Sequence, residues 1–158
     1  MRAVMTNRRI LLVEDQPDFA AVLAAWLRSS HFQVEIADNG LQAVAVATLF
    51  RPEVILLDID LPALDGFNVC RRIREKNWGR DILIISITGL TEVDDCRFAE
   101  SGFNRRLNKP VQYGDIEKLL NGQEIAAASA YSLRPVFSSL CAIATVTCQT
   151  HNTFTPSA

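Results

Sequence analysis

The sequence has no apolar run long enough to cross a membrane and no large excess of charge of one sign. No segment reaches the roughly 20 apolar residues of a spanning helix. Residues 1–9 carry arginines but lead into only a short apolar stretch that ends at Glu14, so we expect no signal peptide. The formal net charge of -2 gives no bulk attraction to nucleic acid or anionic lipid. We therefore expect a cytoplasmic chain without membrane contact or direct DNA binding.

Paired cysteines are also absent. The four cysteines form no C-x-x-C pair, and we interpret them as reduced thiols. What is present is the composition of an ordinary globular protein, with 49% hydrophobic and 22% charged residues. A chain of 158 residues has room for one such domain and a tail.

Three short runs, residues 10–13, 54–57 and 82–87, are apolar almost throughout. This is typical of strands that are covered on both faces of a parallel sheet. Residues 33–37 and 106–108 mix polar with apolar side chains, so we expect these two strands at the edges of the sheet.

Between the expected strands, apolar residues repeat with the spacing of amphipathic helices. We expect a first helix with its stripe at Phe19, Val22, Leu23, Trp26 and Leu27, and a second with its stripe at Leu41, Val44, Ala45, Thr48 and Leu49.

Start and stop signals predict three further helices. The first follows the Asp65-Gly66 turn, and the second begins with Thr91 as N-cap and ends at Gly102. The third covers about residues 113–121, with its apolar stripe at Ile116, Leu119 and Leu120.

Strand and helix therefore alternate five times, which predicts an α/β fold with a doubly wound, five-stranded parallel sheet. The edge positions of the second and fifth strands favour the order 2-1-3-4-5. We expect residues 1–7 to be a leader and residues 8–122 to form the domain. Residues 125–158 hold Arg134 as their single charged side chain, and we expect 123–158 to be a poorly ordered extension.

Polar residues follow the expected strands at their carboxyl ends, where ligands gather in sheets of this kind. Glu14, Asp15 and Asp58 would repel one another there, by up to about 4 kcal/mol per close pair at an effective dielectric near 20. A divalent cation would offset this repulsion, and carboxylates with several waters make an open site of the kind that Mg²⁺ prefers. We expect Asp15 and Asp58 to be direct ligands, with Glu14 acting directly or through water.

Two further residues suit a phosphate ligand at this edge. Lys109 offers a mobile charge that can pair with a carboxylate before phosphorylation and with a phosphoryl oxygen afterwards. Thr88, followed by Gly89, offers a hydroxyl that could turn toward a phosphoryl group on Asp58 and take its loop along.

This pattern resembles the receiver domain of bacterial response regulators, which has the CheY-like or flavodoxin-like fold, over about residues 8–121. The matching pieces are Leu12-Val13-Glu14-Asp15, Leu57-Asp58-Ile59-Asp60-Leu61-Pro62 with Asp65-Gly66, Ile87-Thr88-Gly89, and Lys109-Pro110.

The resemblance implies a two-component phosphorelay. A sensor histidine kinase or phosphotransfer protein would donate a phosphoryl group to Asp58, Mg²⁺ would be required, and the acyl phosphate would later be hydrolysed at the same site. The main-chain carbonyl of Asp60 would be a further metal ligand. A phosphorylation-dependent switch would then signal to a downstream protein through residues 91–121, and the chain would not be an enzyme.

The resemblance also directs attention to particular basic and aromatic residues. The family often has an aromatic residue three positions before the lysine, where this chain has Arg106, which could signal through charge instead. With Arg106, the candidates for partner contact are Arg97, Arg105 and Tyr113. We interpret a basic run on the third helix as a solvated face; it comprises Arg71, Arg72, Arg74 and Lys76.

Two alternatives stay open from the residues. Asp58-Ile59-Asp60 superficially fits a haloacid dehalogenase-type phosphohydrolase, although Pro62 does not suit that motif and Asp94-Asp95 precedes Lys109 instead of following it. A non-phosphorylated interaction module of the same fold is the second alternative, and the full acidic set with Lys109 argues against it.

Overall fold

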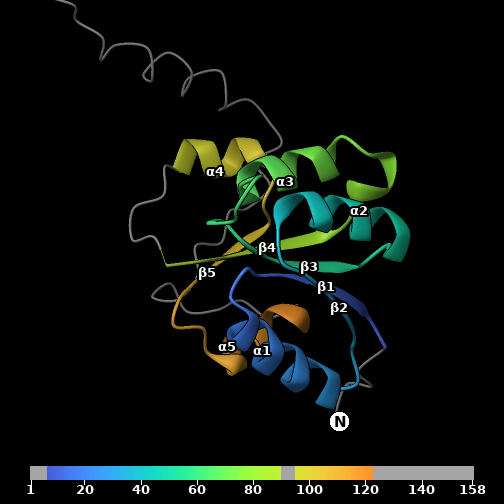
Figure 1. Ribbon diagram of the computed structural model, residues 1–158, viewed down its shortest axis with the longest axis vertical. Helices are drawn as coiled ribbons and strands as arrows, with labels where there is room; N and C mark the ends of the chain where they lie inside the picture. Colours follow the sequence, from blue (N-terminus) through green and yellow to red (C-terminus); the bar gives the residue numbers. More distant parts are fainter. Residues whose placement is uncertain (1–6, 90–94, 123–158) are drawn as a thin grey trace, which may run out of the picture.

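The computed structural model describes residues 7–89 and 95–122, which form a parallel sheet between two layers of helices (Figure 1). The five strands have the order β2-β1-β3-β4-β5, which confirms the predicted order. The strands are β1 (Arg9–Val13), β2 (Gln33–Ala37), β3 (Val54–Asp58), β4 (Leu83–Thr88) and β5 (Arg105–Asn108). The helices are α1 (Pro17–Ser29), α2 (Gly40–Phe50), α3 (Gly66–Arg74), η1 (Asn77–Gly79, 3-10), α4 (Asp95–Ser101) and α5 (Tyr113–Leu120).

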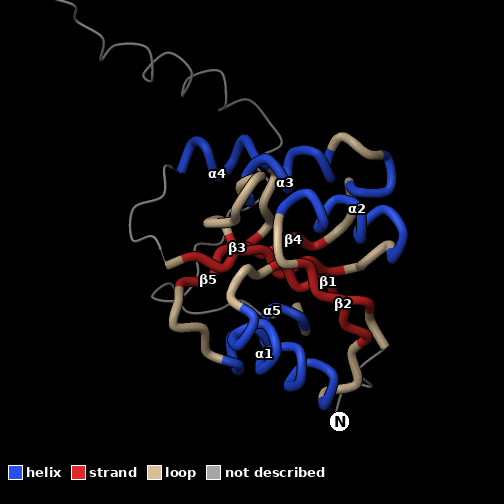
Figure 2. Tube along the Cα trace, in the orientation of Figure 1, coloured by secondary structure: helices blue, strands red, loops and turns tan. Residues whose placement is uncertain are grey.

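Helices α1 and α5 cover one face of the sheet, and α2, α3 and α4 cover the other (Figure 2). Each layer has its own apolar core, because successive side chains of a strand point to opposite faces. In β1, Ile10 and Leu12 enter the core under α1 and α5, whereas Leu11 and Val13 enter the other core. The central strands are therefore buried on both sides, as their continuous apolar runs predict.

The registers bring the carboxyl ends of the strands to one edge of the sheet. Val13 pairs with Leu57, Asp58 pairs with Ile87, and Thr88 pairs with Asn108. Asp58 and Thr88 are thus the last residues of β3 and β4, where we had expected them just past the strands. The difference arises because the ladder of strand pairing continues for one residue beyond the apolar run.

The predicted stripe of α2 is wrong except at Val44, which is partly buried against the core. Leu41 and Leu49 are exposed, Leu49 by 86%, and the helix buries Gly40, Ala43 and Ala47 instead. An added Cβ at Gly40 would lie 2.0 Å from the carbonyl oxygen of Leu64, so the helix packs too closely there for large side chains. Because α2 has no charged residue, the apolar spacing could not choose its inner face.

The stripe of α1 is correct at Leu23 and Leu27, and Phe19 and Trp26 are partly buried. Val22 is exposed, and Ala20 and Ala24 take its place in the core.

The ends of the other helices follow local rules. Asp65 caps α3 by accepting a hydrogen bond of 2.8 Å from the main-chain nitrogen of Asn68. Gly102 ends α4 with a left-handed φ of 88°, which favours glycine. The stripe of α5 is buried as predicted, at Ile116, Leu119 and Leu120. Within residues 7–89 and 95–122, no helix is long and apolar enough to span a bilayer.

Some expectations concern residues outside the described parts. Thr91 as the N-cap of α4 is one of these, and the extension at 123–158 is another. The boundaries of the leader, the domain and the extension stay predictions.

One member of the basic run on α3 is not a solvated residue. Arg71, Arg72 and Lys76 are exposed, as expected, but the guanidinium of Arg74 turns inward. Its nitrogens donate to the main-chain oxygens of Gly102, Gly79, Arg80 and Ile82 and to the Asn104 side chain, at 2.6 to 3.2 Å. Arg74 therefore ties α3 to the start of β4 and to the segment between α4 and β5.

Candidate functional site

Asp58 lies at the centre of the site, at the carboxyl end of β3. The residue is only 3% exposed, and each carboxylate oxygen has its own donor. The main-chain nitrogen of Asp60 donates to Oδ1 at 3.0 Å, and the Lys109 ammonium donates to Oδ2 at 2.6 Å. An added Cβ at Gly66 would lie 2.4 Å from the Asp58 carbonyl oxygen, so the start of α3 packs directly against Asp58. The acceptor candidate is therefore held firmly by its neighbours.

Lys109 follows β5 and joins two carboxylates from different strands. Besides Asp58, its Nζ contacts Glu14 Oε2 at 3.0 Å and Oε1 at 3.3 Å. Its main-chain nitrogen donates to the Thr88 carbonyl at 2.8 Å, which fixes the lysine beside the end of β4. Burial alone would lower the pKa of Lys109, but the hydrogen bonds to Asp58 and Glu14 raise that pKa above its ordinary value. Lys109 thus carries a positive charge at neutral pH.

Glu14 is the buried partner in this arrangement. Burial raises the pKa of Glu14, the charge of Asp58 raises it further, and the hydrogen bond from Lys109 opposes both. The Gln16 main-chain nitrogen also approaches Glu14 Oε1, at 3.4 Å. Glu14 and Asp58 therefore share one ammonium, which offsets part of their mutual repulsion.

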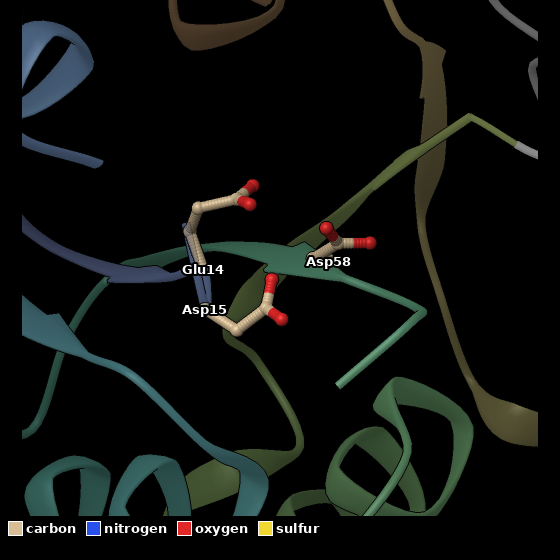
Figure 3. A group of neighbouring side chains, drawn as sticks. All are labelled: Glu14, Asp15 and Asp58. Carbon is tan, nitrogen blue, oxygen red and sulfur yellow. The ribbon is translucent and has the colours of Figure 1, made fainter. Parts of the chain in front are cut away.

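The three acidic residues form one cluster at the ends of β1 and β3 (Figure 3). Glu14, Asp15 and Asp58 each place one carboxylate oxygen within 4.8 Å of the other two. Glu14 and Asp58 are buried, whereas Asp15 is exposed and gives the cluster an open side. Such a set of oxygen donors has the chemistry that Mg²⁺ prefers, because this ion takes carboxylates together with several waters.

Thr88 is the last residue of β4 and lies next to this cluster in the fold, where its main chain contacts Lys109. It is fully buried, and its carbonyl oxygen accepts the hydrogen bond from the Lys109 nitrogen. The structure thus places Thr88 beside Lys109, and the switching role of its hydroxyl stays a prediction.

Phe19 is a neighbour of the site that the sequence did not single out. Its ring centroid lies 5.2 Å from the Lys109 Nζ. We had considered Phe19 only as part of the stripe of α1. Its position in the first turn of the helix that follows Glu14 and Asp15 was the available signal, because that turn begins at the same edge of the sheet as the acidic residues.

The expected partner-contact face is described in part, through α4, β5 and α5. Tyr113 and Arg97 are exposed and Arg105 is partly exposed. Arg97 also pairs with Asp65 Oδ2 at 3.1 Å. Arg106 does not suit direct contact in this conformation, since it is only 4% exposed.

Arg106 lies in β5 beside Ser86 of β4, and both residues are buried. Its Nε donates to Asn108 Oδ1 at 3.2 Å.

The family model of the response regulator receiver domain matches residues 10–121. Among curated proteins, the DNA-binding dual master transcriptional regulator RpaA of Synechocystis is 33% identical over 113 residues, which cover 71% of this chain and 46% of RpaA. The response regulator PleD of Caulobacter vibrioides is 36% identical over 106 residues, which cover 66% of this chain and 23% of PleD. The chain thus spans half or less of the length of these two relatives.

Solved structures with the same architecture include receiver domains from bacteria and yeast. The receiver domain of a sensor histidine kinase from Pseudomonas aeruginosa has a magnesium ion coordinated in its active-site cleft. It is 36% identical with a TM-score of 0.69, and the match covers 74% of this chain and 97% of that one.

A second structure is the receiver domain of Ssk1 from Saccharomyces cerevisiae, bound to the histidine phosphotransfer protein Ypd1. It is 25% identical with a TM-score of 0.69, and the match covers 75% of this chain and 90% of that one. With the family model matching most of the chain and the strand order and acidic cluster in place, this protein belongs to the response regulator receiver domain family.

Proposed function

We propose that Asp58 accepts a phosphoryl group from the phosphohistidine of a sensor histidine kinase or of a histidine phosphotransfer protein. The observation that carries this proposal is the 2.6 Å contact between Lys109 and Asp58 inside a cluster of three carboxylates. Carboxylates in such a cluster repel one another unless cations balance them. Lys109 supplies one positive charge, and the open side at Asp15 leaves room for a metal ion with its waters.

The transfer needs a nucleophile and compensation for added charge. An Asp58 oxygen forms a bond to phosphorus as the phosphorus–nitrogen bond of the phosphohistidine breaks, and the imidazole keeps the electron pair of that bond. Because Lys109 covers Oδ2 of a nearly buried Asp58, its ammonium has to move with the incoming group. Its long stem permits this motion, so the ammonium can pass from the carboxylate to a phosphoryl oxygen. Hydrolysis of the acyl phosphate at the same site then returns the starting state.

The residues present fit a magnesium ion. Asp15 and Asp58 would hold it directly, Glu14 directly or through water, and the main-chain carbonyl of Asp60 would be a further ligand. When bound, Mg²⁺ supplies positive charge to the phosphoryl oxygens and neutralises the carboxylates.

We further propose that phosphorylation changes the face formed by α4, β5 and α5, and that a downstream protein reads this change. Thr88 and Lys109 connect Asp58 to that face, because the two residues end β4 and follow β5. The phosphoryl group itself carries about 1.5 to 2 negative charges. Lys109 would help to neutralise them, and the Thr88 hydroxyl would donate a hydrogen bond to a phosphoryl oxygen. In this role the chain is a signalling protein of the cytoplasm without enzymatic activity on a small molecule and without direct contact with DNA.

Labelling with acetyl phosphate tests the proposal. With Mg²⁺ present, we expect intact-mass spectrometry to show one phosphoryl group per chain, and EDTA to prevent its addition. A phosphohydrolase of the haloacid dehalogenase type would instead turn over a phosphomonoester many times. Repeated turnover, or no labelling at all with Mg²⁺ bound, would reject the proposed function.

The Asp15→Asn variant is expected to bind Mg²⁺ at least tenfold more weakly, because the amide keeps the oxygen but loses the charge that attracts the cation. Calorimetric titration of the wild-type and variant chains with Mg²⁺ measures the difference. Asp81→Asn is the matched control, since Asp81 is an exposed aspartate at the amino end of β4, away from the cluster. Unchanged affinity in Asp15→Asn would reject Asp15 as a ligand.

A further inference from the structure

The Lys109 ammonium has an aromatic neighbour in addition to its two carboxylate partners. Phe19 lies in the first turn of α1 and packs, partly buried, against the core under α1 and α5. Its ring centroid is 5.2 Å from Nζ, within the distance at which an aromatic ring attracts a cation.

We propose that Phe19 is a positioning residue for Lys109, which keeps the ammonium within reach of Asp58 and of the phosphoryl group that arrives there. This inference rests on the proposed function of Asp58. Lysine has a long stem with many rotamers, and the Lys109 side chain is 25% exposed, so water competes for its charge. The ring is held in place by the helix. Its π face attracts the ammonium without donating or accepting a conventional hydrogen bond. Phe19 therefore restricts Lys109 without competing for the hydrogen bonds to Asp58 and Glu14.

The proposal predicts how two rates change together. Lys109 stabilises charge on the phosphoryl group when it arrives and also when water removes it, so a less well-placed ammonium slows both steps. If the ring merely kept water away from the acyl phosphate, removing the ring would make hydrolysis faster instead of slower. The two rates thus distinguish a positioning ring from a shielding one.

The experiment compares Phe19→Leu with Phe19→Tyr in the full chain. Leucine keeps an apolar side chain but has no π face, and tyrosine keeps the face. We expect Phe19→Leu to lower the rate of labelling by acetyl phosphate and the rate of acyl phosphate hydrolysis by about threefold to tenfold each. Phe19→Tyr is expected to restore both rates to within about twofold of wild type.

A second substitution separates this effect from a loss of packing. Phe32 is a buried phenylalanine of the same core that precedes β2, at the amino ends of the strands and opposite the site, so Phe32→Leu repeats the chemical change away from Lys109. We expect Phe32→Leu to lower stability and to leave both rates unchanged.

Three results would overturn the role of Phe19: equal rates in Phe19→Leu and wild type, equal losses in the leucine and tyrosine variants, or faster hydrolysis in Phe19→Leu. Each of them leaves wild-type labelling intact. Failure of the wild-type chain to become labelled would instead contradict the proposed function itself.

Discussion

The Asp58→Asn variant is expected to form no acyl phosphate, whereas Asp60→Asn is expected to become labelled like the wild-type chain. Asparagine keeps the size of Asp58 and an oxygen for the Asp60 N–H, but it loses the charged oxygen that attacks phosphorus. The Asp60 side chain is exposed, and only its main-chain groups belong to the proposed site. Intact-mass spectrometry after incubation with acetyl phosphate and Mg²⁺ measures both outcomes.

The same pair of variants separates two kinds of chemistry. In a haloacid dehalogenase-type enzyme the second aspartate of Asp58-Ile59-Asp60 would itself take part, so Asp60→Asn would lose activity as well. Labelling that persists in Asp58→Asn would place the acceptor elsewhere. An unlabelled Asp60→Asn variant would show that its side chain takes part.

The Arg74→Met variant is expected to lower the free energy of unfolding by about 3 kcal/mol, because several acceptors lose a charged donor at once. The guanidinium donates hydrogen bonds to Gly102 O at 2.9 Å, to Ile82 O at 2.8 Å and to Asn104 Oδ1 at 2.6 Å. Methionine keeps much of the apolar stem and leaves these oxygens without that partner. Urea denaturation monitored by circular dichroism gives the change in stability.

Arg72→Met is the matched control for Arg74. Arg72 is an exposed arginine on the same helix, and a surface substitution of this kind changes stability by about 0.5 kcal/mol or less. Equal effects of the two substitutions would contradict the structural role of Arg74.

The arrangement of the site could be predicted because all strands of a parallel sheet run in the same direction, so that residues at their carboxyl ends lie at one edge. Glu14, Asp58 and Lys109 are far apart in sequence, yet each stands where a strand ends. Parallel strands end at the same edge, so polar residues at the ends of the expected strands were sufficient to predict the convergence. The mixed polar and apolar character of the second and fifth strands, which placed them at the edges, predicted the sheet order.

Other features depend on tertiary packing, which local patterns do not contain. Arg72 and Arg74 have the same chemistry and lie two residues apart, but only the second faces the acceptors between α3 and β5. Helix α2 has no charged residue, so its sequence did not indicate which side faces solvent. The close approach of Gly40 to Leu64 decides which side is buried. Arg106 is buried in β5, although its charge suggested a surface residue.

Determining the structure of the chain with Mg²⁺ and the phosphoryl analogue beryllofluoride would test the central claim most directly. We expect beryllium bonded to a carboxylate oxygen of Asp58, a magnesium ion between Asp15 and Asp58, and the Lys109 ammonium moved onto a fluorine. Beryllofluoride absent from Asp58 at saturating concentration, or a magnesium ion bound away from Asp15, would contradict the assignment of this cluster as the phospho-acceptor site.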